Sequence, residues 1–186
     1  MDSCYVMPAI SHPLNTPELV VLLQRSAIEH LTVFRQLEAE MFNSVCKVVT
    51  TDFEALYAYK CGEYQRCLQL STHNVHTLIH AQGISCVFAY PEFIQLMDDD
   101  IVSLIGLTLI VNPSCRDNNY NAEVVQLHLS LYLMSQCQMK LHHSVMSLAQ
   151  TLDYIEVTRR HLDKRCTLAE LLLKLTERKI LLYISR

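Results

Sequence analysis

The chain has 186 residues, of which 51% are hydrophobic and 18% are charged, and its formal net charge at pH 7 is -4. This length suits one domain with a sizeable core, and the acidic balance offers no basic field for phosphates, so we do not expect a nucleic-acid partner. With only three glycines and five prolines, the chain has few positions for the tight turns of a β-protein. We therefore predict an all-α fold.

The cysteines and the apolar segments indicate the cellular compartment of the protein. Eight cysteines are spread along the sequence without close pairs, which is typical of free thiols in a reducing compartment. No charged-then-apolar leader opens the sequence. The longest apolar run, Ile101 to Val111, is too short to span the roughly 30 Å hydrocarbon core of a bilayer. We expect a cytoplasmic protein without a membrane partner.

Two parts of the chain differ in their patterning. Residues 1–15 contain turn-forming residues without periodicity, so we expect an irregular N-terminal arm there and a single helical domain over residues 16–186. Thr16 and Pro17 provide an N-cap and a first helical residue. Apolar residues then recur every three or four positions to about residue 42, which predicts an amphipathic helix.

A second helix is predicted from the mid-forties to Cys61. Its start is open, because Thr51 and Glu54 have the spacing of a capping box, whereas the apolar pattern also allows a helix that runs through from Ser44. Either choice ends the helix at the glycine that follows Cys61.

Gly62 marks the corner of a helical hairpin. Glycine readily adopts the left-handed conformation that ends many helices. The apolar residues that follow predict a returning helix from Tyr64 to Gly83, antiparallel to the preceding one. Residues 84–90 are β-branched and aromatic, and they allow a short strand, although we favour a loop.

The middle of the chain contains a run of three aspartates at positions 98–100. Carboxylates stabilise the positive end of a helix, so we expect them to cap a helix over Ile101–Val111, which Asn112 and Pro113 end. A short helix over residues 91–97 is predicted before the aspartates, and residues 114–121 form the most polar segment, which we interpret as a loop.

Residues 122–141 are ambiguous. The leucines from Leu127 to Leu133 alternate with other residues as in a strand, yet the apolar positions also fit a broadly buried helix. We choose the helix, because the segment is long and contains no breaker. Two more helices are predicted, from Ser144 to about Leu162 and from Thr167 to about Ser185.

The hairpin around Gly62 resembles the tetratricopeptide repeat. The features that carry the resemblance are a tyrosine and a small residue before Gly62, an acidic Glu63, Tyr64 at the corner and Cys67 where the family usually carries alanine. The resemblance covers roughly a fifth of the chain, with no second clean copy at the family's period of about 34 residues. It implies antiparallel hairpins in an irregular tetratricopeptide-like solenoid or bundle.

The chain as a whole is also similar to the C-terminal helical regions of animal receptors that resemble cyclic-dinucleotide synthases. The acidic nucleotidyltransferase site of such an enzyme is not visible in the sequence. This resemblance implies a regulatory or accessory helical region of a larger nucleotidyltransferase-like receptor.

No constellation of residues predicts a catalytic site or a cofactor. His76 and His80 have the spacing of a helical metal-binding pair, with Cys67 or Cys86 available as further ligands, but no Glu lies between them to act as a base. We therefore expect neither an enzyme nor a bound metal, and we interpret these histidines as capping or solvent-facing.

The predicted function is a non-catalytic protein–protein interaction module. Stacked helical hairpins form a groove that can bind a peptide or a helix of a protein partner. The residues that we expect to line this groove are Tyr57, Tyr59, Tyr64, Arg66 and Gln69.

The last predicted helix carries more apolar surface than one amphipathic stripe needs. This surface would be covered by a neighbouring helix of the same domain, by a second subunit of a homo-oligomer, or by a following part of a longer protein. The residues that we assign to possible self-association are Leu172, Leu175, Ile180, Leu181 and Ile184.

Overall fold

The computed structural model describes residues 44–80, 86–87, 97–111, 124–160 and 167–186, together with seven earlier single positions. These positions are all helical, as predicted: Glu18, Leu19, Leu22, Arg25, Ser26, Glu29 and Val33. The predicted arm at residues 1–15, the polar loop at 114–121 and the short helix before Met97 lie outside the described residues.

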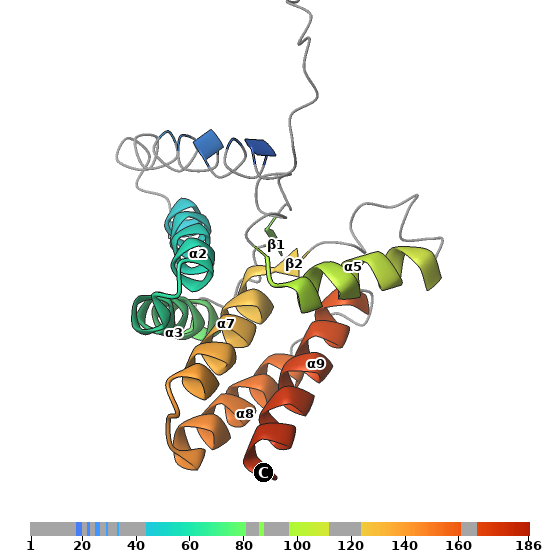
Figure 1. Ribbon diagram of the computed structural model, residues 1–186. Coiled ribbons are helices and arrows are strands. Elements are labelled where there is room, and N and C mark those ends of the chain that lie inside the picture. Colours follow the sequence, from blue (N-terminus) through green and yellow to red (C-terminus); the bar gives the residue numbers. More distant parts are fainter. Residues whose placement is uncertain are drawn as a thin grey trace, which may run out of the picture.

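Helices dominate the described part of the chain (Figure 1), which confirms the all-α prediction. The elements in chain order are α2 (Ser44–Lys60), α3 (Tyr64–His80), β1 (Cys86–Val87), α5 (Asp99–Val111), β2 (Val124–Val125), α7 (Gln126–Lys140), α8 (Val145–Arg160) and α9 (Thr167–Ile184). Because α2 already includes Ser44, the second predicted helix runs through Thr51. The tetratricopeptide-like solenoid stays a prediction.

Two short strands correct the sequence-based expectations. β1 and β2 pair antiparallel, with Cys86 opposite Val125 and Val87 opposite Val124. The loop predicted over residues 84–90 is therefore wrong at Cys86 and Val87, and the helix predicted from residue 122 begins only at Gln126. The physical reason is that backbone pairing between segments far apart in sequence overrides the local helical pattern.

Gly62 forms the corner between α2 and α3, as the sequence predicts. Gly62 has φ +78°, its N–H donates to the carbonyl of Tyr59 at 3.0 Å, and the N–H of Glu63 donates to the carbonyl of Ala58 at 2.8 Å. These two bonds satisfy carbonyl groups that the end of a helix leaves without partners. A hairpin therefore forms at this position.

The corner between α7 and α8 repeats this geometry without a glycine. His142 has φ 54°, its N–H donates to the carbonyl of Met139 at 3.3 Å, and the N–H of His143 donates to the carbonyl of Gln138 at 2.9 Å. The His142 ring also shares a 3.1 Å hydrogen bond with the hydroxyl of Tyr183 in α9. This contact holds the corner beside the end of α9.

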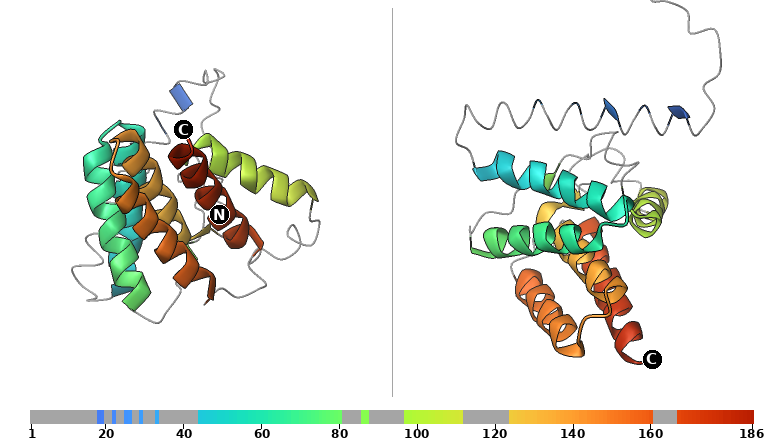
Figure 2. Two further views of the ribbon diagram at one scale, coloured as in Figure 1. Left: turned by 90° about the horizontal axis from the view of Figure 1, so that it is seen from below. Right: turned by 60° about the vertical axis from the view of Figure 1, so that its left-hand side comes forward.

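The centre of the fold is α7, which contacts α2, α3, α8 and α9. All thirteen residues from Gln126 to Gln138 are buried. Figure 2 shows α7 between the α2–α3 hairpin and the pair formed by α8 and α9. α5 crosses α9 and extends away from this bundle (Figure 1). No helix in the described ranges is both long and apolar enough to cross a bilayer.

The two glycines at Gly62 and Gly106 give a matched test of the hairpin corner. No atom lies within 4 Å of a Cβ added at either position, and only Gly62 has a positive φ. Gly62→Ala should lower the free energy of unfolding by about 1–2 kcal/mol, because alanine is strained in the left-handed region. Gly106→Ala should instead raise it by up to about 1 kcal/mol, because alanine is the better helix former.

Urea denaturation of both variants at the same low protein concentration measures these changes. Equal effects of the two substitutions would contradict the role given to Gly62.

Candidate interaction surface

The residues predicted to line a groove lie around the α2–α3 corner and differ in their exposure. Tyr57, Tyr59 and Tyr64 are half-buried against the core, and the rings of Tyr59 and Tyr64 meet edge-on at 5.6 Å between centroids. Arg66 and Gln69 are exposed on α3. The aromatic members therefore contribute to packing, and a role of this set in partner binding stays a prediction.

Arg66 is held by two carboxylates of its own hairpin. Its guanidinium lies 3.3 Å from Glu63 and 3.7 Å from Glu54. The Arg66 and Glu63 side chains are both more than half exposed, so this pair contributes little to stability.

Asp98 caps α5, as predicted for the acidic run. Its Oδ1 accepts a hydrogen bond from the N–H of Asp100 at 3.1 Å. Its Oδ2 accepts a hydrogen bond from the hydroxyl of Tyr59 at 3.1 Å. Burial, followed by the nearby Asp98 charge, raises the pKa of Tyr59, so this phenol remains a donor. The N-terminus of α5 is thereby fixed to the end of α2.

Lys179 of α9 ties the same end of α5 to the centre of the fold. Its Nζ donates to the Tyr132 hydroxyl at 3.0 Å and lies 5.1 Å from the centroid of that ring, and it also forms an ion pair with Asp100. Burial and the adjacent aspartates raise the pKa of Tyr132. The predicted capping residues thus belong to a network that joins α2, α5, α7 and α9.

A second polar cluster is closed to solvent between α2, α3 and α7. Oδ1 of the buried Asp52 accepts hydrogen bonds from Asn74 Nδ2 at 2.7 Å and from Ser130 Oγ at 2.6 Å, while Oδ2 has no hydrogen-bond partner. Burial raises the pKa of Asp52 to about 7, against the effect of these two bonds. The two hydrogen bonds of this buried carboxyl join α2 to α3 and α7.

His128 is buried on α7 with both ring nitrogens lacking a partner. Burial lowers the pKa of His128 to about 4, so the ring is neutral at physiological pH. Asp52 and His128 are thus both closed to solvent in the folded chain.

The histidines and cysteines considered as metal ligands are described only in part, because the side chains of His80 and Cys86 lie outside the described residues. The described residues contain no group of three or more metal-ligating side chains. The ring of His76 meets Tyr154 of α8 edge-on, with 5.7 Å between centroids. Cys61, Cys67 and Cys137 are free thiols, and Cys61 is exposed.

The apolar stripe assigned to self-association is divided between two faces of α9. Leu172 and Ile180 are buried in the core of their own domain, and Leu175 and Ile184 are half-buried. A neighbouring helix of the same domain therefore covers most of this stripe. Of the five predicted residues, Leu181 alone is exposed.

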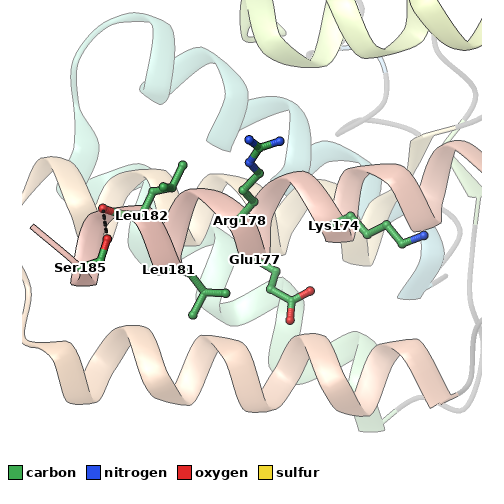
Figure 3. A pocket seen from close by; sticks show the side chains of 6 residues that line it. All are labelled: Lys174, Glu177, Arg178, Leu181, Leu182 and Ser185. Carbon is green, nitrogen blue, oxygen red and sulfur yellow. Dashed lines mark hydrogen bonds between the residues drawn. The ribbon is translucent and has the colours of Figure 1, made fainter.

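The exposed face of α9 forms an open hollow of about 510 Å³. Leu181 and Leu182 are its apolar members, and they are 52% and 53% exposed. Figure 3 shows them on adjacent sides of the helix, with Leu181 directed towards α8. The residues that line the hollow are Lys174, Glu177, Arg178, Leu181, Leu182 and Ser185.

Charges surround these two leucines. Glu177 accepts a 2.6 Å hydrogen bond from Arg159 of α8, and Lys174 lies 2.7 Å from Glu170 of the preceding turn. The Lys174 ammonium lowers the pKa of Glu170. Arg178 forms no ion pair with any residue in the described part of the chain. The hollow therefore presents two exposed leucines beside charged side chains of both signs.

No protein-family model, curated protein or solved structure matches this chain. The resemblances to the tetratricopeptide repeat and to the synthase-like receptors accordingly stay predictions. The sequence pattern of α9 indicated excess apolar surface, but it did not indicate which leucines remain exposed.

Asp98 and Asp99 allow a matched test of the network at α5. Asp98→Ala should lower the free energy of unfolding by about 1–2 kcal/mol, because it removes both the cap and the acceptor of the Tyr59 hydroxyl. Asp99→Ala should lower it by less than about 1 kcal/mol, because this exposed residue interacts mainly with the helix dipole. Urea denaturation measures both changes, and equal losses would contradict the network.

The substitution Asp52→Asn tests the ionisation of the buried carboxyl through the pH dependence of the free energy of unfolding. The pKa of Asp52 is about 7 in the folded chain, against an ordinary value of 3.8. Its contribution to the free energy of unfolding is therefore fully present below pH 3.8 and is lost as the pH rises to about 7. An asparagine can keep the two hydrogen bonds at Oδ1 but cannot ionise. The free energy of unfolding of the variant, relative to that of the wild type, should therefore rise by up to about 1.4 kcal/mol per pH unit in this window.

Urea denaturation of both proteins between about pH 4.5 and pH 8 measures this difference. Because His128 is present in both, its own titration cancels in the comparison. A difference that does not change with pH would show that Asp52 is not the titrating group.

Proposed function

We propose that this chain is a non-catalytic protein–protein interaction module and that the outer face of α9 is its contact surface. The observation that carries the proposal is the exposure of two consecutive leucines, Leu181 and Leu182, on a helix that also buries Leu172 and Ile180 in the core. Exposed apolar residues surrounded by charged ones are typical of protein interfaces.

The rigidity of α9 supports this role. Lys179 connects the helix to Asp100 and Tyr132, and Glu177 connects it to Arg159 of α8. A helix held from several sides presents its outer face without further ordering, which lowers the entropic cost of binding. The hollow is open, so it suits side chains from a partner's surface better than an enclosed small molecule.

The chemistry of the hollow also supports a non-catalytic role. The Ser185 hydroxyl donates to the backbone carbonyl of Leu182 at 3.1 Å, as Figure 3 shows. No histidine lies among the described residues that line the hollow. A nucleophilic serine would need an adjacent base within hydrogen-bond distance. A contact surface explains the same residues without that requirement.

A paired capture experiment tests the proposal. The wild-type chain is used to capture interacting proteins, which are then quantified by mass spectrometry against the double variant Leu181→Asp with Leu182→Asp. Two carboxylates would have to be desolvated at the interface. The captured amount of each specific partner should therefore fall by about tenfold or more.

The control is Met146→Asp with Val157→Asp, which adds the same charge to exposed positions of α8. It should retain the captured partners. Circular dichroism checks that both variants fold. Partners that survive the α9 substitutions but are lost with the α8 substitutions would place the contact surface elsewhere.

A further inference from the structure

Two buried cysteines lie at matching positions on α3 and α7. Asn74 of α3 and Ser130 of α7 donate to the same oxygen of Asp52, so these two residues lie opposite each other. Cys67 precedes Asn74 by seven residues, and Cys137 follows Ser130 by seven. Seven residues are about two helical turns, which return a side chain to nearly the same face. Each cysteine therefore lies on the face of its helix that contributes to the Asp52 cluster.

The two thiols are in contact across the seam between these helices. A side-chain hydrogen bond joins Cys67 to Cys137, so α3 and α7 run antiparallel here. Both side chains are 0% exposed, both are free thiols, and Ser71 Oγ lies 3.8 Å from the sulfur of Cys67. A disulfide requires two cysteines whose side chains converge. The hydrogen bond shows that these side chains do converge.

The two cysteines occupy helix ends of opposite polarity. Cys67 is in the first turn of α3, where its N–H donates to the carbonyl of Glu63 at 3.0 Å. Cys137 is in the last turn of α7, where its carbonyl accepts from the N–H of Leu141 at 2.9 Å. The N-terminus of a helix favours a thiolate and the C-terminus disfavours one.

The hydrogen bond between the thiols acts in the same direction as the helix ends. It lowers the pKa of Cys67 and, together with burial, raises the pKa of Cys137. Cys67 is therefore the thiol that ionises more readily, and Cys137 is the thiol that donates to it. This asymmetry is what a peroxide-reactive cysteine and its resolving partner need.

We propose that Cys67 and Cys137 form a redox-sensitive modification site, at which hydrogen peroxide produces a reversible disulfide between α3 and α7. The Cys67 thiolate attacks one oxygen of the peroxide, the O–O bond breaks, and the leaving hydroxide takes up the proton that Cys67 released. The Cys137 sulfur then attacks the sulfenic sulfur of Cys67, and the hydroxyl group leaves with the proton of Cys137 as water. Two thiols thus lose two electrons and two protons, and one peroxide is reduced to two molecules of water.

The ends of the two helices give a small oxidant its way to the pair. Gln65 and Arg66 next to Cys67 are exposed, and so is Lys140 at the end of α7. Helix ends open locally at a lower free-energy cost than the centre of a fold. Because oxidation has to wait for this opening, Cys67 should react more slowly than the exposed Cys61.

The disulfide fastens the α2–α3 hairpin to the central helix. It joins residues that lie 70 positions apart in the chain. A cross-link that closes a long loop restricts the unfolded chain strongly and so stabilises the folded one. The site lies outside the hollow of α9, so the proposal goes beyond the function proposed for that surface and does not depend on it.

Peptide mapping of the full chain tests the pair. Reduced protein is treated with hydrogen peroxide, the remaining thiols are alkylated, and the digest is analysed by mass spectrometry. The principal disulfide should link the peptides of Cys67 and Cys137, and dithiothreitol should restore both thiols. The urea midpoint of the oxidised protein should be higher than that of the reduced protein by about 1 M or more.

The matched control is Cys61→Ser, which removes the exposed thiol and should keep the linked peptide. An oxidised protein without the Cys67–Cys137 peptide would overturn the proposal. So would a linked peptide that forms only in urea, because the pairing would then belong to the unfolded chain.

Two single variants separate the roles of the sulfurs. In Cys137→Ala the sulfenic acid of Cys67 has no resolving thiol, so dimedone should label Cys67 after peroxide treatment. In Cys67→Ala dimedone should not label Cys137. Circular dichroism checks that both variants fold. Equal labelling of the two cysteines, or labelling of neither, would overturn the proposed site.

Discussion

The complete burial of α7 is the constraint on which the arrangement of the other helices depends. Thirteen successive residues of one helix are removed from water, and several of them are polar. A buried polar group is unfavourable unless it is hydrogen-bonded. Ser130 donates to Asp52 on α2, Gln138 accepts from a threonine of α8, and Tyr132 accepts from Lys179 of α9. Each bond fixes a different neighbour, so the helices around α7 are positioned by polar contacts as well as by the packing of leucines.

The same constraint explains which parts of the fold could be predicted from the sequence. The corner at Gly62 and the cap at Asp98 depend on local backbone chemistry, and both are present as predicted. The pairing of Cys86 with Val125 was missed because it depends on residues far apart in the chain. The alternation around Leu127 suggested a strand, but it arises from a helix that is buried on all sides, where the apolar positions need not follow one face.

The candidate site could be predicted only in part, for a related reason. The leucine-rich pattern of α9 indicated that more than one face is apolar, and of the five residues assigned to self-association only Leu181 is exposed. Leu172 and Ile180 show the same pattern in the sequence but point towards the core, because the contacts with α7 and α8 decide the rotation of α9. The bond between Tyr59 and Asp98 joins residues 39 positions apart, so no local motif indicated it. Exposure is a property of the assembled helices and not of the segment alone.

The buried core also changes protonation on folding, and its two titrating groups act in opposite directions. Asp52 has a pKa of about 7 in the folded chain against an ordinary 3.8, and His128 has a pKa of about 4 against an ordinary 6.5. Between about 4 and 6.5, the unfolded chain carries a carboxylate and an imidazolium, whereas the folded chain carries a carboxylic acid and a neutral imidazole. The number of bound protons is the same in both states, so the two contributions to the pH dependence of stability cancel. At higher pH only Asp52 still titrates, and its carboxylate then becomes a buried charge stabilised by two hydrogen bonds at a single oxygen.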